Sequence, residues 1–103
     1  EADELLFLFG LNKKLGPILE WNIDLNGKKI SVNTENFQTS VEGIFAVGDI
    51  NDYPGKLDLI LSGFHETTLA VQEAYKRLYP GERVPFGYTT SNSKLQEKLG
   101  VKK

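Results

Sequence analysis

Two short segments of the sequence combine residue types that could bind a ligand. Gly48-Asp49 closes an apolar run, and an Asp at the carboxyl end of a parallel strand can accept hydrogen bonds from sugar or ribityl hydroxyls. The Gly before it would let a bulky ligand approach the backbone. The segment from Tyr88 to Ser91 joins an aromatic face that could stack on a planar heterocycle to hydroxyls that could bond to it. In the structural interpretation, the first segment only turns the chain and the second packs the tail onto the body.

Residues 62–69 carry a charge-based signal and exclude one class of enzyme. The amides around Ser62-Gly63-Phe64 could form a helix N-terminus, which favours negative charge. His65 is the single histidine, and in a first helical turn it is either a catalyst or a solvated or capping side chain. The segment from His65 begins like the H-E-x-x-H zinc signature, but Leu69 replaces the second ligand, which excludes that class of protease. We assign no catalytic residue and no metal ligand.

Two short apolar runs predict strands of an α/β fold. Residues 5–9 are continuously apolar and end at Gly10, a pattern typical of a strand buried on both faces. Residues 43–50 form a second run, for which we predict a central parallel strand whose C-terminal end carries Asp49. Residues 51–57 would follow as a loop. A ligand would then bind beyond the carboxyl end of the second strand.

A β-hairpin is predicted between these two runs. Residues 23–25 and 28–32 alternate in polarity and flank Asn26-Gly27, the dipeptide that best tolerates the two positive φ angles of a type I′ turn. The apolar residues of this pattern would share the buried side; they are Ile23, Leu25, Ile30 and Val32. Before the hairpin, Pro17 can start a one-turn helix that runs through Trp21.

A long helix and a short one are predicted in the second half of the chain. Apolar and small residues recur every three or four positions and would line one packed face; they are Leu61, Phe64, Thr68, Val71, Ala74, Tyr75 and Leu78. Glu73 and Arg77 would pair on the polar side, and Pro80-Gly81 would stop the helix. In the tail, residues 93–96 (Ser-Lys-Leu-Gln) offer a capping box for a short helix ended by Gly100.

Length, composition and charge exclude several classes of protein. With 103 residues the chain is one small domain or a fragment of something larger, because roughly 100–200 residues make a domain. The net charge of −2 and the lack of a basic tract argue against a nucleic-acid partner. Cys is absent, which fits a reducing compartment, and no apolar run reaches the roughly 20 residues that a membrane helix needs. We therefore expect no nucleic-acid or membrane partner and a cytoplasmic location.

The same motifs, taken together, resemble those of a known family. Residues 39–49 (Thr-Ser-Val-Glu-Gly-Ile-Phe-Ala-Val-Gly-Asp) resemble the T-S-x-x-G-[IV]-[FY]-A-x-G-D signature of pyridine nucleotide-disulfide oxidoreductase flavoproteins. Residues 53–64 and the tail from Tyr88 to Ser91 are similar to the thioredoxin-reductase-like ferredoxin–NADP reductases. Thioredoxin reductases normally have Arg-Gln where this chain has Lys56-Leu57, and they lack the long tail. Both departures favour the ferredoxin-reducing branch.

The resemblance covers essentially the whole chain but only the last third of such an enzyme. It implies an α/β fold that is the C-terminal part of an FAD-binding Rossmann-like three-layer domain, with short strands, one long helix and a C-terminal extension. Residues 1–9 match the last strand of the NADPH-binding domain, 10–79 the C-terminal part of the FAD-binding domain, and 80–103 the extension over the flavin. The abrupt acidic start of the chain suggests that an upstream part is missing.

The resemblance also implies cofactor-binding roles for particular residues. Asp49, preceded by Gly48, would bind the ribityl chain of FAD. Leu57 and Asp58 would approach the pyrimidine edge of the flavin with their backbone. In the C-terminal extension, the ring of Tyr88 would stack over the flavin, and the hydroxyl of Thr90 would contact the cofactor.

For an intact protein, the resemblance implies FAD and NADPH as cofactors, ferredoxin or a similar electron carrier as partner, and a homodimer. Neither G-x-G-x-x-G nor the P-loop motif occurs in these residues, so we expect the isolated chain to carry no flavin and to be inactive. Two alternatives remain open. One is a fragment of a thioredoxin reductase, and the other is a cofactor-free α/β interaction module that binds a partner through the exposed faces of residues 1–9 and 44–50.

Overall fold

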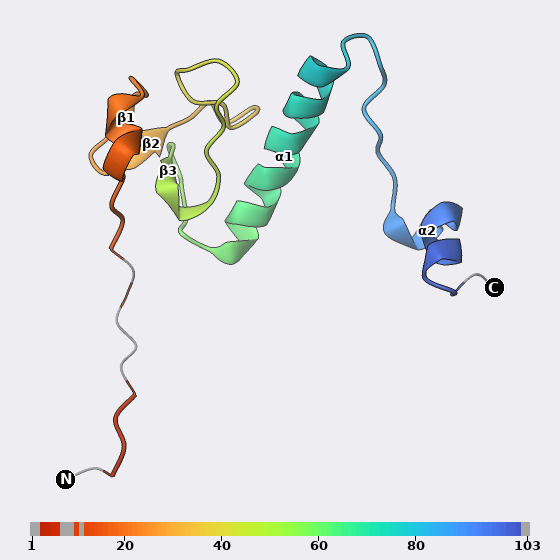
Figure 1. The fold of residues 1–103 in the computed structure, drawn as a ribbon, viewed down its shortest axis with the longest axis horizontal. Helices are drawn as coiled ribbons and strands as arrows, with labels where there is room; N and C mark the ends of the chain where they lie inside the picture. Colours follow the sequence, from red (N-terminus) through yellow and green to blue (C-terminus); the bar gives the residue numbers. More distant parts are fainter. Residues whose placement is uncertain (1–2, 7–9, 11, 102–103) are drawn as a thin grey trace.

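The computed structural model describes residues 3–6, 10 and 12–101 and shows a small sheet followed by one long helix. Its elements are η1 (Gly16–Glu20), β1 (Leu25–Asn26), β2 (Lys29–Ser31), η2 (Gly48–Ile50), β3 (Asn51–Asp52), α1 (Ile60–Leu78), η3 (Thr89–Ser91) and α2 (Ser93–Lys98). In Figure 1, α1 lies between the sheet and α2. The expected mixture of short strands with one long helix is confirmed at this coarse level. The predicted strand at 5–9 falls largely on residues 7–9, which lie outside the described residues.

The hairpin is confirmed, but its turn lies one residue later than predicted. Leu25 pairs with Ile30 and Asn26 with Lys29, so the two turn residues are Gly27 and Lys28. Gly27 has φ +61°, whereas Lys28 is not among the residues with positive φ, which fits a type II′ turn rather than type I′. The observed register sets Leu25 opposite Ile30. A turn at Asn26-Gly27 would have set Leu25 opposite Lys28, and that lysine would then have lain on the buried side of the hairpin.

The third strand corrects the prediction of a parallel strand at 43–50. Phe45 makes only an isolated antiparallel bridge with Gln38, and the chain then turns through η2. The strand parallel to β2 is β3, so that Ile30 lies beside Asn51 and Ser31 beside Asp52. The extended conformation is interrupted because Gly48 has φ +80°, a value that L side chains rarely adopt.

The hydrophobic core lies between the hairpin, η1 and the segment before η2. Its buried members are Leu15, Ile23, Ile30 and Ala46, and the half-buried residues around them are Ile18, Leu25, Val32, Val41, Ile44 and Ile50. The predicted shared side of the hairpin is thereby confirmed. The one-turn helix predicted from Pro17 is also confirmed, as the 3-10 helix η1.

The long helix forms over nearly the predicted residues, but its predicted packed face is mostly exposed. Leu61, Phe64, Val71 and Leu78 are 76%, 70%, 61% and 73% exposed, whereas the buried residues of α1 are Glu66 and Ala70. The small residues on the other face allow α1 to approach η2 closely. A Cβ built on Gly63 would lie 3.5 Å from the Cα of Gly48. Burial of this helix is therefore decided by small residues and one charge, not by its apolar stripe.

The ends of the two helices follow their local sequence. In α1, Arg77 Nε donates to Glu73 at 3.1 Å as predicted, and the helix ends at Leu78, before Pro80-Gly81. The N-cap of α2 is Asn92 and not Ser93, since the Asn92 Oδ1 accepts from the amide of Leu95 at 3.0 Å. The chain has a radius of gyration of 18.9 Å, above the roughly 13 Å of a compact domain of this length, and many large apolar side chains of the described residues are exposed.

Candidate functional site

The best-connected polar group of the described residues is the carboxylate of Glu66, in the second turn of α1. One oxygen, Oε2, accepts from the backbone amide of Gly48 at 2.7 Å and from Asn51 Nδ2 at 2.9 Å. The other, Oε1, accepts from the Tyr53 hydroxyl at 3.0 Å and forms an ion pair with the ammonium of Lys56. All four donors come from the segment that leads from η2 to α1. We call Glu66 and these four donor residues the Glu66 network.

The Glu66 network is buried, and its electrostatics keep the carboxylate charged. The side chains of Glu66 and Lys56 are 0% and 2% exposed. Burial alone would raise the pKa of Glu66, but the hydrogen bonds from its four donors outweigh burial and hold the pKa below its ordinary value. Burial and the bond to Glu66 both raise the pKa of the Tyr53 phenol. At neutral pH the network therefore holds an ionised carboxylate against an ammonium, with little contact with solvent.

Two further contacts hold the donors of the network in place. The ring of Tyr53 packs edge-to-face against buried Phe37, with centroids 5.5 Å apart. Asn51 Nδ2 also donates to the carbonyl of Ala46 at 3.0 Å, which fixes the orientation of its amide. The reversed amide would turn Oδ1 toward the carboxylate of Glu66, where two acceptors would face each other.

Gly48 and Asp49, both predicted to contact a ligand, lie directly beside this network. The amide of Gly48 donates to Glu66, and its carbonyl accepts from Lys56 Nζ at 2.9 Å. Asp49 follows in η2, and its side chain is exposed. A Cβ on Gly48 would meet no atom within 4 Å, so glycine is required there by its positive φ and not by crowding within the chain. The structure thus presents an outward carboxylate on a rigidly held turn.

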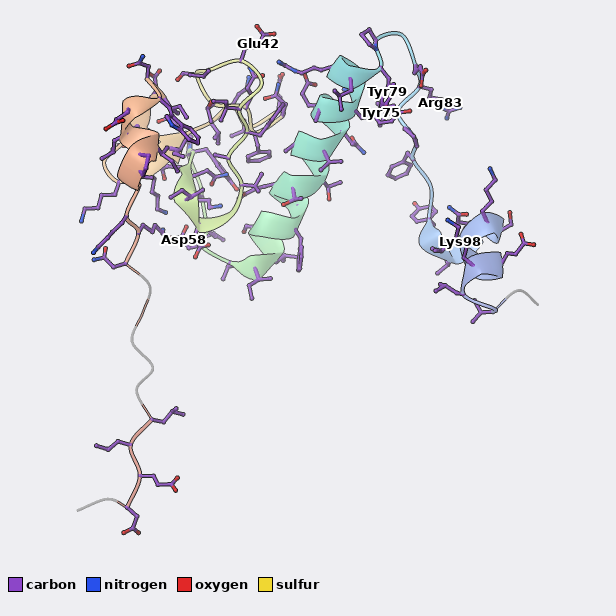
Figure 2. All side chains as sticks on the ribbon, viewed as in Figure 1. Glu42, Asp58, Tyr75, Tyr79, Arg83 and Lys98 are labelled. Carbon is purple, nitrogen blue, oxygen red and sulfur yellow. The ribbon has the colours of Figure 1, made fainter. Side chains whose placement is uncertain are left out.

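Leu57 and Asp58, the next two predicted site residues, lie in the connection between β3 and α1, where Figure 2 labels Asp58. Asp58 forms ion pairs with Lys29 at 2.9 Å and with Lys13 at 3.2 Å. The hydrogen bonds from these lysines lower the pKa of Asp58, and the same bond raises the pKa of Lys29. The side chain of Leu57 is exposed, and its carbonyl accepts from the amide of Leu59 at 2.9 Å. The Asp58 side chain therefore ties this connection to the hairpin, which leaves its backbone for any ligand contact.

The tail residues are not brought to the same place. Tyr88 is 73% exposed and packs edge-to-face on Phe86, with centroids 6.1 Å apart. The carbonyl of Thr90 accepts from Gln96 at 2.6 Å, so this residue is held to α2. Figure 1 shows α2 on the opposite side of α1 from the sheet. The structure therefore unites Gly48, Asp49 and the connection at 57–58, but leaves Tyr88 and Thr90 apart from them.

The remaining candidates of the α1 N-terminus gain no contact that points to catalysis. His65 is exposed in the first turns of α1. The N-cap residue Leu59 provides no side-chain cap, and its carbonyl accepts from the amide of Gly63 at 3.2 Å. Over the described ranges, no three acidic or histidine side chains are arranged to hold a metal ion. Within those ranges, too, no helix has the length and apolarity that a membrane span requires.

The central role of Glu66 was not predicted because the packed face of this helix was predicted from its apolar stripe alone. Glu66 lies on a second helical face with Gly63, Ala70 and Ala74, at spacings of three and four. A face of small residues that carries one acid indicates close packing on a neighbour that supplies a cation. This signal was present in the sequence, although its partner, Lys56, could not be identified from spacing.

Comparison with known proteins relates almost the whole chain to one group. A ferredoxin–NADP reductase of Mesorhizobium japonicum is 63% identical over 97 residues, which are 94% of this chain and 28% of that protein. Proteins of the same name from Beijerinckia indica and Nitrobacter hamburgensis are 58% and 56% identical over 100 residues, 97% of this chain and 29% of each. No protein-family model matches the chain. The chain is thus a close relative of a segment of proteins named ferredoxin–NADP reductase, and it spans less than a third of their length.

Proposed function

We propose that this chain is the C-terminal FAD-binding segment of a longer NADPH-dependent reductase that passes electrons to ferredoxin or a similar carrier. The observation that carries the proposal is the 56–63% identity, over 94–97% of the chain, to proteins named ferredoxin–NADP reductase. That name favours the ferredoxin branch over a thioredoxin reductase. Because the chain spans only 28–29% of these relatives, activity belongs to the full-length protein that would contain it, which we expect to be a cytoplasmic homodimer.

The residues around Gly48 fit one side of an FAD molecule. The exposed carboxylate of Asp49 can accept hydrogen bonds from ribityl hydroxyls. The backbone of Leu57 and Asp58 can supply polar groups to the pyrimidine edge, since the Asp58 side chain is engaged with Lys29. A bound flavin supplies hydride acceptance from NADPH and onward release of electrons, while the protein binds and orients it. In this chain the Gly48 turn that carries Asp49 is held by the side chains of Glu66 and Lys56.

The tail would complete the flavin site only after it moves against the rest of the full-length protein. The proposed stacking of Tyr88 and the proposed contact of Thr90 need residues 80–103 to cover the flavin. Tyr88 and Phe86 are largely exposed, so few of the contacts made within this chain would be lost when the tail moves. We assign the stacking role to Tyr88 because its ring is the aromatic group that leads into η3, next to Thr90.

The exposed apolar face of α1 also fits a segment of a longer protein. Leu61, Phe64, Val71 and Leu78 are each more than 60% exposed along one helix. A contiguous apolar surface of this kind marks an interaction site. The remaining part of the full-length protein, which makes up more than two thirds of the relatives, would cover this face. Residues 1–9 would then join the NADPH-binding domain, and residues 10–79 the FAD-binding domain.

The substitution Asp49→Ala in the full-length protein tests the proposed function. Losing the acceptor for the ribityl hydroxyls should weaken FAD binding by about tenfold or more, because hydrogen bonds to charged groups contribute about 1.5–3 kcal/mol. Flavin content after purification and the dissociation constant of the apoprotein for FAD are the measurements. Asp24→Ala, which removes an exposed carboxylate from the hairpin segment, is the matched control and should leave both unchanged. Undiminished FAD affinity in Asp49→Ala would contradict the proposal.

A further inference from the structure

The two segments proposed to contact the cofactor are joined by a single buried ion pair. Gly48-Asp49 and Leu57-Asp58 lie eight or more residues apart in the sequence. Lys56 connects them, because it directly precedes Leu57 and its ammonium reaches the carbonyl of Gly48 at 2.9 Å. The same ammonium pairs with Glu66, which holds the amide of Gly48 at 2.7 Å. The Lys56–Glu66 pair is therefore one of the contacts that set the relative position of the two segments.

The peptide groups on both sides of Gly48 are fixed by this pair. Glu66 accepts from its N–H group, and Lys56 donates to its carbonyl. Gly48 has φ +80°, and glycine has more conformational freedom than any other residue, so an unheld glycine would allow many directions for the following side chain. Clamping both polar groups restricts the directions that the backbone offers to Asp49.

We propose that the Lys56–Glu66 ion pair is a positioning pair, which sets the direction of Asp49 for binding FAD without itself touching FAD. This inference rests on the proposed function. The proposed role differs from a purely structural one because the pair makes two hydrogen bonds to Gly48, the residue next to the proposed ligand-binding carboxylate of Asp49. Charge-assisted hydrogen bonds are stronger and more directional than neutral ones, which suits a group that must fix an orientation.

The test is a double-mutant cycle between the ion pair and Asp49 in the full-length protein. The pair is neutralised together, as Lys56→Met with Glu66→Gln, because removing both charges leaves no buried unpaired ion and is tolerated far better than removing one. The dissociation constant of each apoprotein for FAD is measured by quenching of flavin fluorescence. The four proteins are the natural sequence, the neutralised pair, Asp49→Ala, and the combination.

The neutralised pair should bind FAD about tenfold more weakly, which is at the low end of the roughly 10–100-fold loss seen when the partners that orient metal ligands are removed. If the pair acts through Asp49, neutralising the pair in the Asp49→Ala background should weaken FAD binding by at most about a further threefold. The single variant Lys56→Arg keeps the cation and should bind FAD with most of the affinity of the natural protein. Tyr53→Phe removes another donor of Glu66 without touching Gly48, and it should leave FAD affinity near that of the natural protein.

Each outcome decides between the two proposals. Equal losses from neutralising the pair in both backgrounds, or no loss in either, overturn the positioning role while leaving the proposed function standing. A loss in Tyr53→Phe as large as in the neutralised pair shows that the network acts only through stability, and it overturns the positioning role as well. If Asp49→Ala alone binds FAD normally, both proposals fail. Should this neutralised pair not fold, the same cycle is run with Lys56→Gln and Glu66→Gln, which also removes both charges but keeps a polar group at each position, and the same comparisons decide.

Discussion

The two faces of α1 reverse the usual placement of charged and apolar side chains. On the face toward η2, the helix buries the carboxylate of Glu66 completely. On the opposite face, Phe64 and Val71 are 70% and 61% exposed. Both faces belong to one helix of 19 residues, so backbone conformation cannot account for the difference. What differs is whether the described part of the chain supplies partners for each face.

The comparison shows how differently the two kinds of side chain depend on their partners. A buried charge without partners costs several kcal/mol, so Glu66 can be buried only because four donors meet it within 18 residues of sequence. An exposed apolar side chain costs far less, and a helix tolerates several of them. The charged face is thus complete within the chain, whereas the apolar face has few partners in the described part of the chain.

The largest expected effect comes from removing the charge of the complete face. Glu66→Ala leaves Lys56 buried without its partner and should lower the free energy of unfolding of the chain by about 3–5 kcal/mol. Glu73→Ala breaks the solvent-facing pair with Arg77 and should cost about 0.3–0.5 kcal/mol. Urea unfolding followed by circular dichroism measures both. Similar losses in the two variants would remove the distinction between the faces.

An intermediate effect is expected from the apolar face, and only in the longer protein. Val71→Thr replaces a methyl with a hydroxyl at nearly constant volume and helix propensity. In the 103-residue chain, where Val71 is largely exposed, the variant should be within about 0.5 kcal/mol of the natural sequence. In the full-length protein, a covered hydroxyl should cost about 1–3 kcal/mol. Equal effects in the two contexts would mean that the rest of the protein does not cover this face.

The smallest effect is the acid dependence of stability. The folded pKa of Glu66 lies below its ordinary value of 4.5, so its stabilising contribution is present above about pH 4.5 and is lost as the pH falls toward the folded pKa. Each unit of difference corresponds to about 1.4 kcal/mol. Glu66→Gln should flatten the fall in unfolding free energy below pH 4.5.

Asp58→Asn provides the control for this acid titration. The pKa of Asp58 is also lowered, by Lys29 and Lys13, so its contribution has the same sign as that of Glu66. Asp58 is exposed, so its contribution to the acid dependence of the unfolding free energy should disappear in about 1 M salt, where charges are screened within a few ångströms. A Glu66→Gln variant with the same acid slope as the natural protein would show that the network does not titrate as a buried pair.

Local patterns predicted the elements better than their contacts. The alternation around Asn26-Gly27 predicted the hairpin, and the 3.6-residue period predicted α1, because both patterns depend on neighbours in sequence. The turn position was wrong by one residue. The observed register keeps Lys28 in the turn and off the buried side of the hairpin, and this requirement outweighs the turn preference of the dipeptide Asn26-Gly27. The strand at 43–50 was wrong because Gly48 ends the extension and the pairing partner, β2, is chosen through tertiary contacts.

The candidate site was predictable only in part. Gly48 and Asp49 were found from a local motif, and the structure places them on one turn beside the connection that carries Leu57 and Asp58. Tyr88 depends on surfaces far away in sequence, and no local pattern fixes where its ring lies. The Lys56–Glu66 pair escaped prediction because two opposite charges ten residues apart are common in any sequence. Only the fold shows that both are buried.

The short sequence distances within the Glu66 network affect how the protein can fold during synthesis. The hydrogen bonds to Glu66 join residues separated by 10 to 18 positions, whereas the parallel pairing of β2 with β3 must close a longer loop between Ile30 and Asn51. Closing a shorter loop costs less chain entropy, and local contacts form faster. Ile30 and Asn51 are synthesised before Glu66, so β2 can pair with β3 first, and we expect the short loops of the Glu66 network to fasten the Gly48 turn to α1 as soon as Glu66 is available.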